Sequence, residues 1–485
     1  NVIDLCPDGA LTSKPYVFEA RPWELKKTET IDVMDAVGSN IRVDTYGWEV
    51  KRILPRVNED INEEWISDKT RYACDGLKNQ RLDTPFIKEG KKFKKISWID
   101  AYELLQHKIE KTKLEKIGCF TGDLTNMETA YAAKELFNKV FKSNLIDARA
   151  ENSYVNFSEK INYRFNSNIT GIEEADLILM IGCNPRFEAT ILNSRIRKSY
   201  LKSKLPIYST NDIGDQTYPY EVLGNNTNVI KDIVEGRSVL SEKIIKSLKP
   251  IVIIGQSVLK LKSGQYIFEE IKKFLNKHDK INDQWNSLNV LSKDASTVGS
   301  YDLTLFSSNN GRNLLLEKLQ NNSIDLLFLI GQDKLKVDKK DLFIVYIGSH
   351  GDEGAKNSDL ILPGSAYTEQ DGYYTNLEGK IQKAYKASYP TELAKEDWLI
   401  VNEISKLARG KVLYKEKNEL VDSMLNYLNQ NRKEEFILTD FNFENETILV
   451  DDIDYYFSNV IAKNSKTMLE CKTLRSNLEK TGTDG

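Results

Sequence analysis

The sequence contains few residues of the kinds that hold metals, bind nucleic acids or cross membranes. Its 485 residues include only 5 cysteines and 3 histidines. The cysteines are scattered singly, which argues against a secreted disulfide framework and indicates a reducing compartment. A formal net charge of −4 offers no basic surface for a nucleic acid. Apolar runs such as Leu326–Ile330 are far shorter than the roughly 20 residues that span a bilayer, so we expect no direct membrane insertion.

What the chain does have is enough length and apolar content for more than one core. Of its 485 residues, 40% are hydrophobic and 29% are charged, so we expect two or more globular domains. Near the start, Ile41–Pro55 alternates apolar and polar residues around Tyr46 and Gly47, the pattern of a hairpin with one buried face. A small β-rich module is therefore expected before the main body.

Beyond this module, short apolar runs alternate with segments of helical spacing. The expected strands are rich in Ile, Leu and Val and lie at 117–120, 175–181, 206–209, 251–255, 324–330 and 342–347. The expected helices lie at 97–109, 127–141, 188–201 and 265–277, with a last one near 454–474. Apolar strands that alternate with helices indicate parallel strands buried on both faces. The predicted fold class is α/β, with doubly wound, mostly parallel sheets.

Glycine ends four of these strands, at Gly182, Gly255, Gly331 and Gly348. Ligands of open α/β sheets bind beyond the carboxyl ends of the strands, where a glycine lets the backbone approach a phosphate. Alternatively, the glycine only permits the tight turn from strand to helix. The sequence alone does not say whether a ligand or the chain's own side chains fill these crevices.

Two stretches carry a family resemblance. One is Ala175–Ala189, with Gly182-Cys-Asn-Pro-Arg at its centre, and the other is Gly348–Gln382, which begins Gly-Ser-His-Gly-Asp-Glu-Gly. They are similar to the molybdopterin-oxidoreductase superfamily, and most closely to the 75 kDa subunit family of respiratory complex I, the NADH:ubiquinone oxidoreductase. The resemblance extends over almost the whole chain, and it implies a molybdopterin-oxidoreductase-like fold.

Together with the strand pattern, the resemblance predicts five parts. Residues 1–24 would end an iron–sulfur, ferredoxin-like domain, and residues 25–89 would form the small β-rich module. Two α/β domains are expected at 90–249 and 250–410, because a charged helical connector precedes residue 250 and the strand pattern then starts again. Residues 411–485 would form a C-terminal extension that contains a helix.

The metal ligands that the superfamily implies are replaced in this sequence. Its members commonly hold a 4Fe-4S cluster with Cys-x-x-Cys-x-x-x-Cys and a later Cys-x-Lys-Gly-Arg. Here Asp32, Asp35 and Ser39 stand at the first pattern and Ser67 at the second. Because such clusters are held by thiolates, we expect none in the β-rich module. The two aspartates could instead bind a hard cation, although such a pair more often caps a turn or a helix.

The other candidates for chemistry stand alone in the sequence. Cys74 and Cys183 have no companion thiols, and we interpret them as packing residues. His350 lies in a glycine-rich turn beside Asp352 and Glu353, a setting compatible with acid–base chemistry. With no nucleophile or metal set near it in the sequence, it is better explained as a residue that caps the turn. We therefore expect no catalytic residue, no molybdenum and no pterin.

Cys6 is followed by Pro7, the ending of ferredoxin-type ligand runs, but the upstream cysteines of such a run are absent. In the complex I family the corresponding residue closes the iron–sulfur domain. The resemblance implies that Cys6 is the fourth ligand of one 4Fe-4S cluster shared with another chain, the gene being split at this junction. The alternatives are a processed form or a fragment, in which Cys6 is left over from a lost domain.

The resemblance implies a core subunit of the peripheral arm of complex I. Such a subunit is a scaffold for electron transfer from NADH toward ubiquinone, without molybdopterin chemistry of its own. The implied partners are other complex I subunits, including the chain with the missing iron–sulfur domain and the flavin subunit.

The implied location is the matrix side of the mitochondrial inner membrane, with the cytoplasmic face of a bacterial membrane as the second candidate. The abundance of Lys, Asn and Ile is compatible with an AT-rich organelle genome. Two other functions stay open at this stage. One is a free-standing molybdopterin-dependent oxidoreductase such as a formate dehydrogenase, and the other is a nucleotide-binding module that kept the crevices without the metal.

Overall fold

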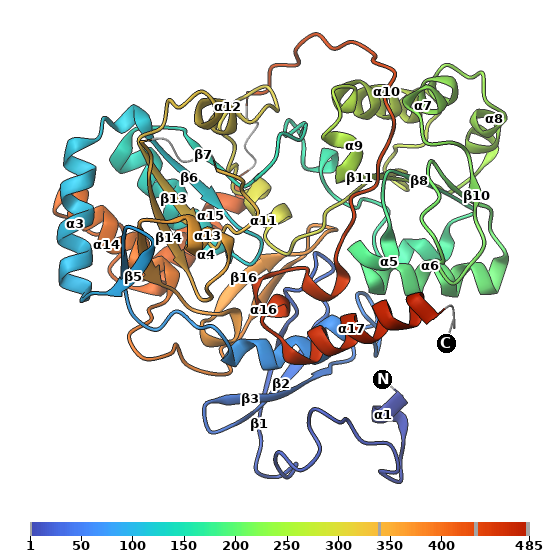
Figure 1. The fold of residues 1–485 in the computed structure, drawn as a ribbon. Coiled ribbons are helices and arrows are strands. Elements are labelled where there is room, and N and C mark those ends of the chain that lie inside the picture. Colours follow the sequence, from blue (N-terminus) through green and yellow to red (C-terminus); the bar gives the residue numbers. More distant parts are fainter. Residues whose placement is uncertain (1, 338–340, 431–434, 482–485) are drawn as a thin grey trace.

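The computed structural model describes residues 2–337, 341–430 and 435–481, which fold into two α/β lobes above a small β module (Figure 1). Parts of the expected terminal regions, at residues 1, 431–434 and 482–485, lie outside the described residues. The module is a three-stranded antiparallel sheet of β1 (Lys26–Ile31), β2 (Asn40–Tyr46) and β3 (Glu49–Pro55). Its turn at Gly47, with φ of +59°, confirms the predicted hairpin.

The first lobe contains a seven-stranded sheet in the order β5-β4-β15-β14-β13-β6-β7. Its strands are β4 (Phe86–Glu89), β5 (Lys92–Lys95), β6 (Ile117–Thr121), β7 (Ile146–Asp147), β13 (Leu326–Ile330), β14 (Phe343–Gly348) and β15 (Leu360–Pro363). The five strands β7, β6, β13, β14 and β15 run parallel, and β4 and β5 add an antiparallel edge.

Both faces of this sheet are buried. Along β13, Leu326 and Phe328 face a core shared with α3 (Trp98–Lys111), α4 (Met127–Glu135), α14 (Asp397–Arg409) and α15 (Lys417–Asn429). Leu327 and Leu329 face the opposite core, which includes α12 (Leu314–Gln320) and α13 (Glu353–Asn357). This two-residue alternation explains why a continuous apolar run forms the strand.

The second lobe contains a five-stranded, fully parallel sheet in the order β10-β9-β8-β11-β12. Its strands are β8 (Leu177–Ile181), β9 (Ile207–Ser209), β10 (Glu221–Val222), β11 (Pro250–Gly255) and β12 (Leu288–Leu291). One face packs on α6 (Thr190–Ser203), which follows α5 (Pro185–Glu188), and the other on α7 (Thr227–Val234), α8 (Val239–Lys246) and α10 (Gly264–Lys277). The predicted fold class, α/β with mostly parallel sheets after a β-rich module, is confirmed.

The boundary expected at residue 250 does not separate the two large sheets. Strand β11 begins there, but it pairs in parallel with β8 and therefore belongs to the same five-stranded sheet. The seven-stranded sheet likewise combines β6 and β7 with strands from β13 onward. The restart of the strand pattern therefore marks the next strand of the same sheet. The other expected divisions of the chain stay predictions.

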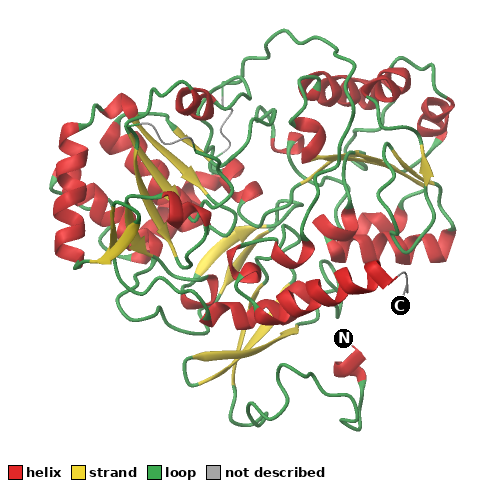
Figure 2. Cartoon of the chain, in the orientation of Figure 1, coloured by secondary structure: helices red, strands yellow, loops and turns green. Residues whose placement is uncertain are grey.

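The C-terminal part of the chain crosses from the lobes to the β module. After α15, residues 435–454 contain no helix or strand (Figure 2). The expected last helix appears as α16 (Val460–Lys463) and α17 (Lys466–Thr481), and Ile461 and Met468 pack into the core of the module. In the parts of the chain that the structure describes, no helix is both long and apolar enough to span a membrane.

Candidate functional site

The four positions at which cluster ligands would stand are buried together beside the β module. Asp32, Asp35 and Ser39 lie between β1 and β2, while Ser67 caps α2 (Asp68–Tyr72). All four residues are at most 3% exposed. Ser39 joins the group through its carbonyl oxygen, which accepts the Asp32 N–H at 2.8 Å. The predicted pattern is thus brought into one buried cluster.

Oxygen atoms and an ammonium group, instead of sulfur, connect these positions. Thr70 Oγ1 donates to Asp32 Oδ2 at 2.8 Å and lies 2.7 Å from Ser67 Oγ. Lys69 Nζ lies 3.3 Å from Asp35 Oδ2. Lys69 was not singled out from the sequence, although it stands at the lysine of the Cys-x-Lys-Gly-Arg pattern.

Burial and repulsion act against the charges of this cluster. Burial, aided by the charge of Asp35, raises the pKa of Asp32 to about 7. Burial also works against the charged form of Lys69, but the charges of Asp35, Tyr455 and Asp32 keep the pKa of Lys69 above its ordinary value. Lys69 is therefore a buried cation, and Asp35 is its counter-ion.

These residues do not fit an iron–sulfur cluster. Carboxylate and hydroxyl oxygens are hard donors, whereas the irons of such clusters take thiolates. Each aspartate already accepts a backbone N–H of its own loop, Asp32 from Met34 and Asp35 from Val37, both at 3.1 Å. An ammonium group beside Asp35 would also repel a metal cation. Across the described ranges, no three His, Cys, Asp or Glu side chains are grouped so that they could hold a metal ion.

Cys6 lies apart from this cluster, at the start of the described chain. The backbone N–H groups of the residues that follow it lower the pKa of its thiol, Leu11 most strongly, and Ala10, Asp8 and Gly9 also contribute. Gly9 adopts φ of +65°, which lets the loop turn back on the sulfur. N–H groups directed at a sulfur stabilise the thiolate, which is the form that ligates metals.

The isolated candidates from the sequence are structural in this fold. Burial raises the pKa of Cys74 to about 12 and that of Cys183 well above the ordinary value, so both stay protonated thiols. His350 is fully buried, with Nδ1 2.8 Å from Ser349 Oγ and Nε2 3.1 Å from the Gly76 carbonyl oxygen. Burial lowers the pKa of His350 to about 3, so it is a neutral group that fixes its turn.

A cleft of about 430 Å³ lies between the carboxyl ends of the two large sheets and reaches Lys69. Lysines a few residues beyond three strand ends line it: Lys260 follows β11, Lys293 follows β12 and Lys334 follows β13. Lys334 Nζ lies 2.7 Å from Asp123 Oδ2 and 2.8 Å from Asp294 Oδ1. The sequence signal that could have found these lysines is their place just after strands of parallel sheets.

Asp451, from the C-terminal part of the chain, supplies the counter-charge for the other two lysines. Lys260 Nζ lies 2.7 Å from Asp451 Oδ2, and Lys293 hydrogen-bonds to the same oxygen. Lys260 also forms an ion pair with Glu151, across the cleft. Each of these three lysines is therefore neutralised by carboxylates of the chain itself.

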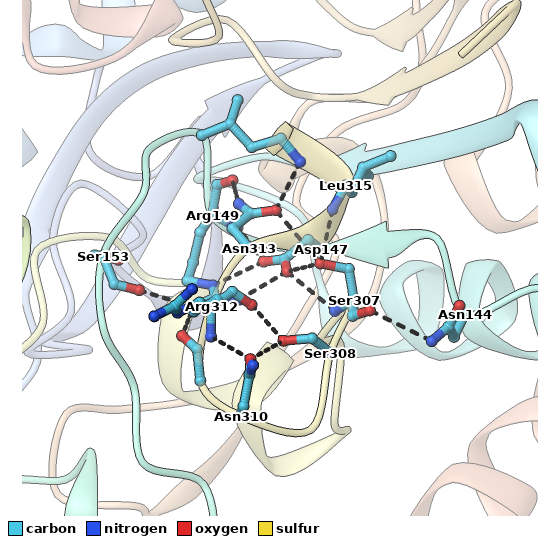
Figure 3. Close-up of polar contacts among 12 residues, drawn as sticks. Asn144, Asp147, Arg149, Ser153, Ser307, Ser308, Asn310, Arg312, Asn313 and Leu315 are labelled. Carbon is cyan, nitrogen blue, oxygen red and sulfur yellow. Dashed lines mark hydrogen bonds and ion pairs between the residues drawn. The ribbon is translucent and has the colours of Figure 1, made fainter. Parts of the chain in front are cut away.

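A buried ion pair supports the wall of the cleft beside β7 (Figure 3). Arg149 Nη2 and Nε donate to the two carboxylate oxygens of Asp147 at 2.8 and 2.9 Å, and Ser307 Oγ donates to Asp147 Oδ2 at 2.7 Å. Arg149 also donates to the carbonyl oxygens of Ser153 and Gly311 at 2.8 and 2.7 Å. This guanidinium joins two loops through charge-assisted bonds and is held in place by them.

The cleft does not fit a pterin dinucleotide, because its lysines already carry carboxylate partners. The space beyond the end of β8 is also filled by side chains of the protein itself. A Cβ atom at Gly182, where φ is +56°, would lie 2.1 Å from Val258 Cγ2 and 3.2 Å from Ile448 Cγ2. At this strand tip the glycine permits a turn against the protein's own side chains, which is the second of the two interpretations considered from the sequence.

Comparison with known proteins identifies relatives over nearly the whole chain. The 78 kDa subunit of mitochondrial NADH-ubiquinone oxidoreductase from Candida albicans is 41% identical, over 99% of this chain and 69% of the relative. The 75 kDa subunit of NADH-ubiquinone oxidoreductase from Reclinomonas americana is 39% identical, over 98% and 72%. A subunit of NADH-quinone oxidoreductase from Rickettsia bellii is 39% identical, over 99% and 71%.

Two family models match different parts of the chain. The molybdopterin oxidoreductase family matches residues 81–407, which hold both large sheets. The 4Fe-4S domain of the NADH-ubiquinone oxidoreductase NDSU1/NuoG-like family matches residues 25–75, which include the buried cluster of Asp32, Asp35, Ser39 and Ser67. The chain therefore belongs to the family of the 75 and 78 kDa subunits of NADH-ubiquinone oxidoreductase.

Proposed function

We propose that this chain is a scaffold subunit in the peripheral arm of complex I, on the matrix side of the mitochondrial inner membrane, and that it performs no catalysis itself. The observation that carries the proposal is the buried set of Lys69, Asp35 and Asp32, which stands where a metal cluster would need soft donors. The cleft supports it as well, since its lysines are paired with the chain's own carboxylates. Such a chain contributes shape and surface to its neighbours, and apart from one cluster at its edge the electron carriers lie elsewhere.

One edge of the chain takes part in electron transfer in this proposal. Cys6 is the fourth ligand of a 4Fe-4S cluster, since the N–H groups around its sulfur favour the thiolate. The other three thiolates come from the iron–sulfur domain of the assembled complex. The flavin subunit is a further partner in the same arm.

Electron paramagnetic resonance of the reduced, assembled complex tests this assignment. Replacing Cys6 by alanine should remove or shift the signal of one 4Fe-4S cluster and leave the others unchanged. Cys471→Ala is the matched control, because burial raises the pKa of this thiol on α17, whereas backbone N–H groups lower that of Cys6. An unchanged set of signals in Cys6→Ala would overturn the assignment.

A second candidate function is a molybdopterin-dependent oxidoreductase, which the match of residues 81–407 favours. Elemental analysis separates the two candidates. The scaffold proposal predicts no molybdenum or tungsten above trace amounts in the purified protein. Either metal in a stoichiometric amount, together with pterin, would overturn it.

A further inference from the structure

Residues 444–454, here called the strap, cross the carboxyl end of the five-stranded sheet. Figure 1 shows this part of the chain in red, passing between the two lobes on its way to α16. Thr227 N–H donates to the Glu446 carbonyl oxygen at 2.9 Å, and Glu446 N–H donates to Thr227 Oγ1 at 2.9 Å. Ile448 is fully buried, and its carbonyl oxygen accepts from Asn211 Nδ2 at 2.7 Å. The strap is thus fixed where a ligand of an open α/β sheet would lie.

Asp451 lies at the point where the strap reaches the cleft. Its N–H donates to Ser257 Oγ at 3.1 Å, which fixes the backbone. Its Oδ2 atom receives both Lys260, at 2.7 Å, and Lys293. The side chains of Lys293 and Lys260 are 14% and 27% exposed, so these ammonium groups are only partly solvated. A single carboxylate oxygen therefore contacts both of these partly buried cations, and Glu151 is a second counter-ion of Lys260.

The arrangement of two lysines around one carboxylate oxygen resembles the coordination of a bound oxyanion. Lys260 ends α9 (Gln256–Leu259), the short helix that follows β11, and Lys293 follows the adjacent parallel strand β12. The two side chains meet at one oxygen beside an open cleft. Burial works to raise the pKa of Asp451, but the hydrogen bonds from Lys260 and Lys293 outweigh it and hold that pKa below the ordinary value. The carboxylate stays ionised in this position, as an anionic ligand would be.

We propose that Lys260 and Lys293 form an oxyanion-binding site at the carboxyl end of the five-stranded sheet, and that Asp451 of the strap is its resident ligand. Phosphates and carboxylates share the chemistry that this site recognises. With Asp451 in place, the site is closed to external oxyanions. This inference goes beyond the scaffold function and does not depend on Cys6.

Chemical rescue of the full chain by inorganic phosphate tests the proposal. In sodium chloride, Asp451→Ala should melt at least about 2 °C below the wild type, because Lys293 loses its ion pair with Asp451 and Lys260 keeps only Glu151. Replacing chloride by phosphate at equal ionic strength should restore the melting temperature with a saturable dependence on phosphate concentration. Acetate, which resembles the missing side chain, should also restore it, at higher concentration.

Asp452→Ala is the matched control, since Asp452 also lines the cleft but makes no ion pair with Lys260 or Lys293. This control and the wild type should show no phosphate-specific rise in melting temperature. Lys260→Met combined with Asp451→Ala should abolish the rescue. A rise of equal size in all variants would be a general salt effect, and it would overturn the proposal.

Asp451→Asn keeps the side-chain volume and serves as the second variant if Asp451→Ala does not fold in chloride. It should melt below the wild type and regain stability in phosphate. Absence of a phosphate-specific effect in both Asp451 variants would overturn the proposal, as would wild-type stability of both in chloride. Neither result would bear on the cluster at Cys6, which is measured by a different signal.

Discussion

Lys69 and Asp35 form a buried ion pair beside the β module, with Nζ and Oδ2 3.3 Å apart and each side chain only 2% exposed. Their pair lies within the residues that match a 4Fe-4S domain. The attraction between them compensates part of the cost of removing both charges from water. The pair, together with Asp32 and Thr70, forms a polar core at the positions where a metal cluster would provide cross-links.

Loss of the Lys69 cation should destabilise the protein strongly. Lys69→Met leaves Asp35 and Asp32 buried without their counter-ion, which costs on the order of 3–5 kcal/mol. Urea denaturation monitored by circular dichroism measures the free energy of unfolding. Lys356→Met, which breaks an exposed pair with Glu353, should cost less than about 1 kcal/mol.

A double variant sharpens the same test. Adding Asp35→Asn to Lys69→Met removes one uncompensated charge, so the double variant should be more stable than the sum of the two single effects predicts. Strictly additive effects would show that Lys69 and Asp35 do not interact.

Ionisation of the buried Glu188 side chain should lower the stability of the protein as the pH rises. This residue is only 2% exposed. One of its carboxylate oxygens accepts the Asn184 N–H at 2.8 Å. The other oxygen has no hydrogen-bond partner among the described residues. Burial raises the pKa of Glu188 from 4.5 to about 7. The folded state thus binds the proton more tightly than the unfolded state, and the stabilisation present below pH 4.5 is lost as the pH rises through 7.

Glu188→Gln should remove this part of the pH dependence. The free energy of unfolding of the wild type, minus that of the variant, should decrease by on the order of 3 kcal/mol between pH 4.5 and pH 8. Denaturant titrations of both proteins at a series of pH values measure this difference. Parallel pH profiles of the two proteins would contradict the assignment.

Arg149 should contribute far more to stability than an exposed arginine in a similar pair. Arg149→Met leaves the buried Asp147 carboxylate uncompensated and the carbonyl oxygens of Ser153 and Gly311 without their donor, at a cost of about 3–5 kcal/mol. Arg237→Met, whose pair with Asp232 is exposed, should cost less than about 1 kcal/mol. Thermal melts of the two variants measure their stabilities. A similar fall in melting temperature for Arg149→Met and Arg237→Met would contradict the prediction.

Cys6 should be the most reactive thiol of the chain. N–H groups of the loop lower its pKa, whereas burial raises the pKa of the thiols at positions 74, 119, 183 and 471. Iodoacetamide at pH 7.5, followed by peptide mass spectrometry, should therefore modify Cys6 first. Faster alkylation of Cys74 or Cys183 than of Cys6 would refute this ranking.

Much of the fold could be predicted because buried parallel strands have a simple pattern. Leu326–Ile330 and Ile251–Ile254 are continuously apolar, and each forms a strand that is buried on both faces. Strand β12 was not anticipated, because its Asn289 interrupts the apolar run. That side chain is fully buried and is satisfied by Ser167, through bonds of 2.8 and 2.9 Å that no local pattern reveals.

The candidate site was only partly visible in the sequence. Asp32, Asp35, Ser39 and Ser67 could be located, because they stand at the spacing of a known ligand pattern. The pairing of Lys260 with Asp451 could not, since the two residues are 191 positions apart and meet only when the strap crosses the sheet. The strand pattern likewise does not reveal that β11, which begins at residue 250, pairs with β8 in one sheet.

Iron and acid-labile sulfide should be measured, together with Mössbauer spectra, in the full chain carrying Cys6→Ala after anaerobic reconstitution. Without Cys6, the positions of the family's ligand pattern offer only the oxygen donors beside Lys69, so no 4Fe-4S spectrum should appear. A stoichiometric cluster that persists in Cys6→Ala and disappears when Asp35 or Ser67 is also replaced by alanine would contradict it.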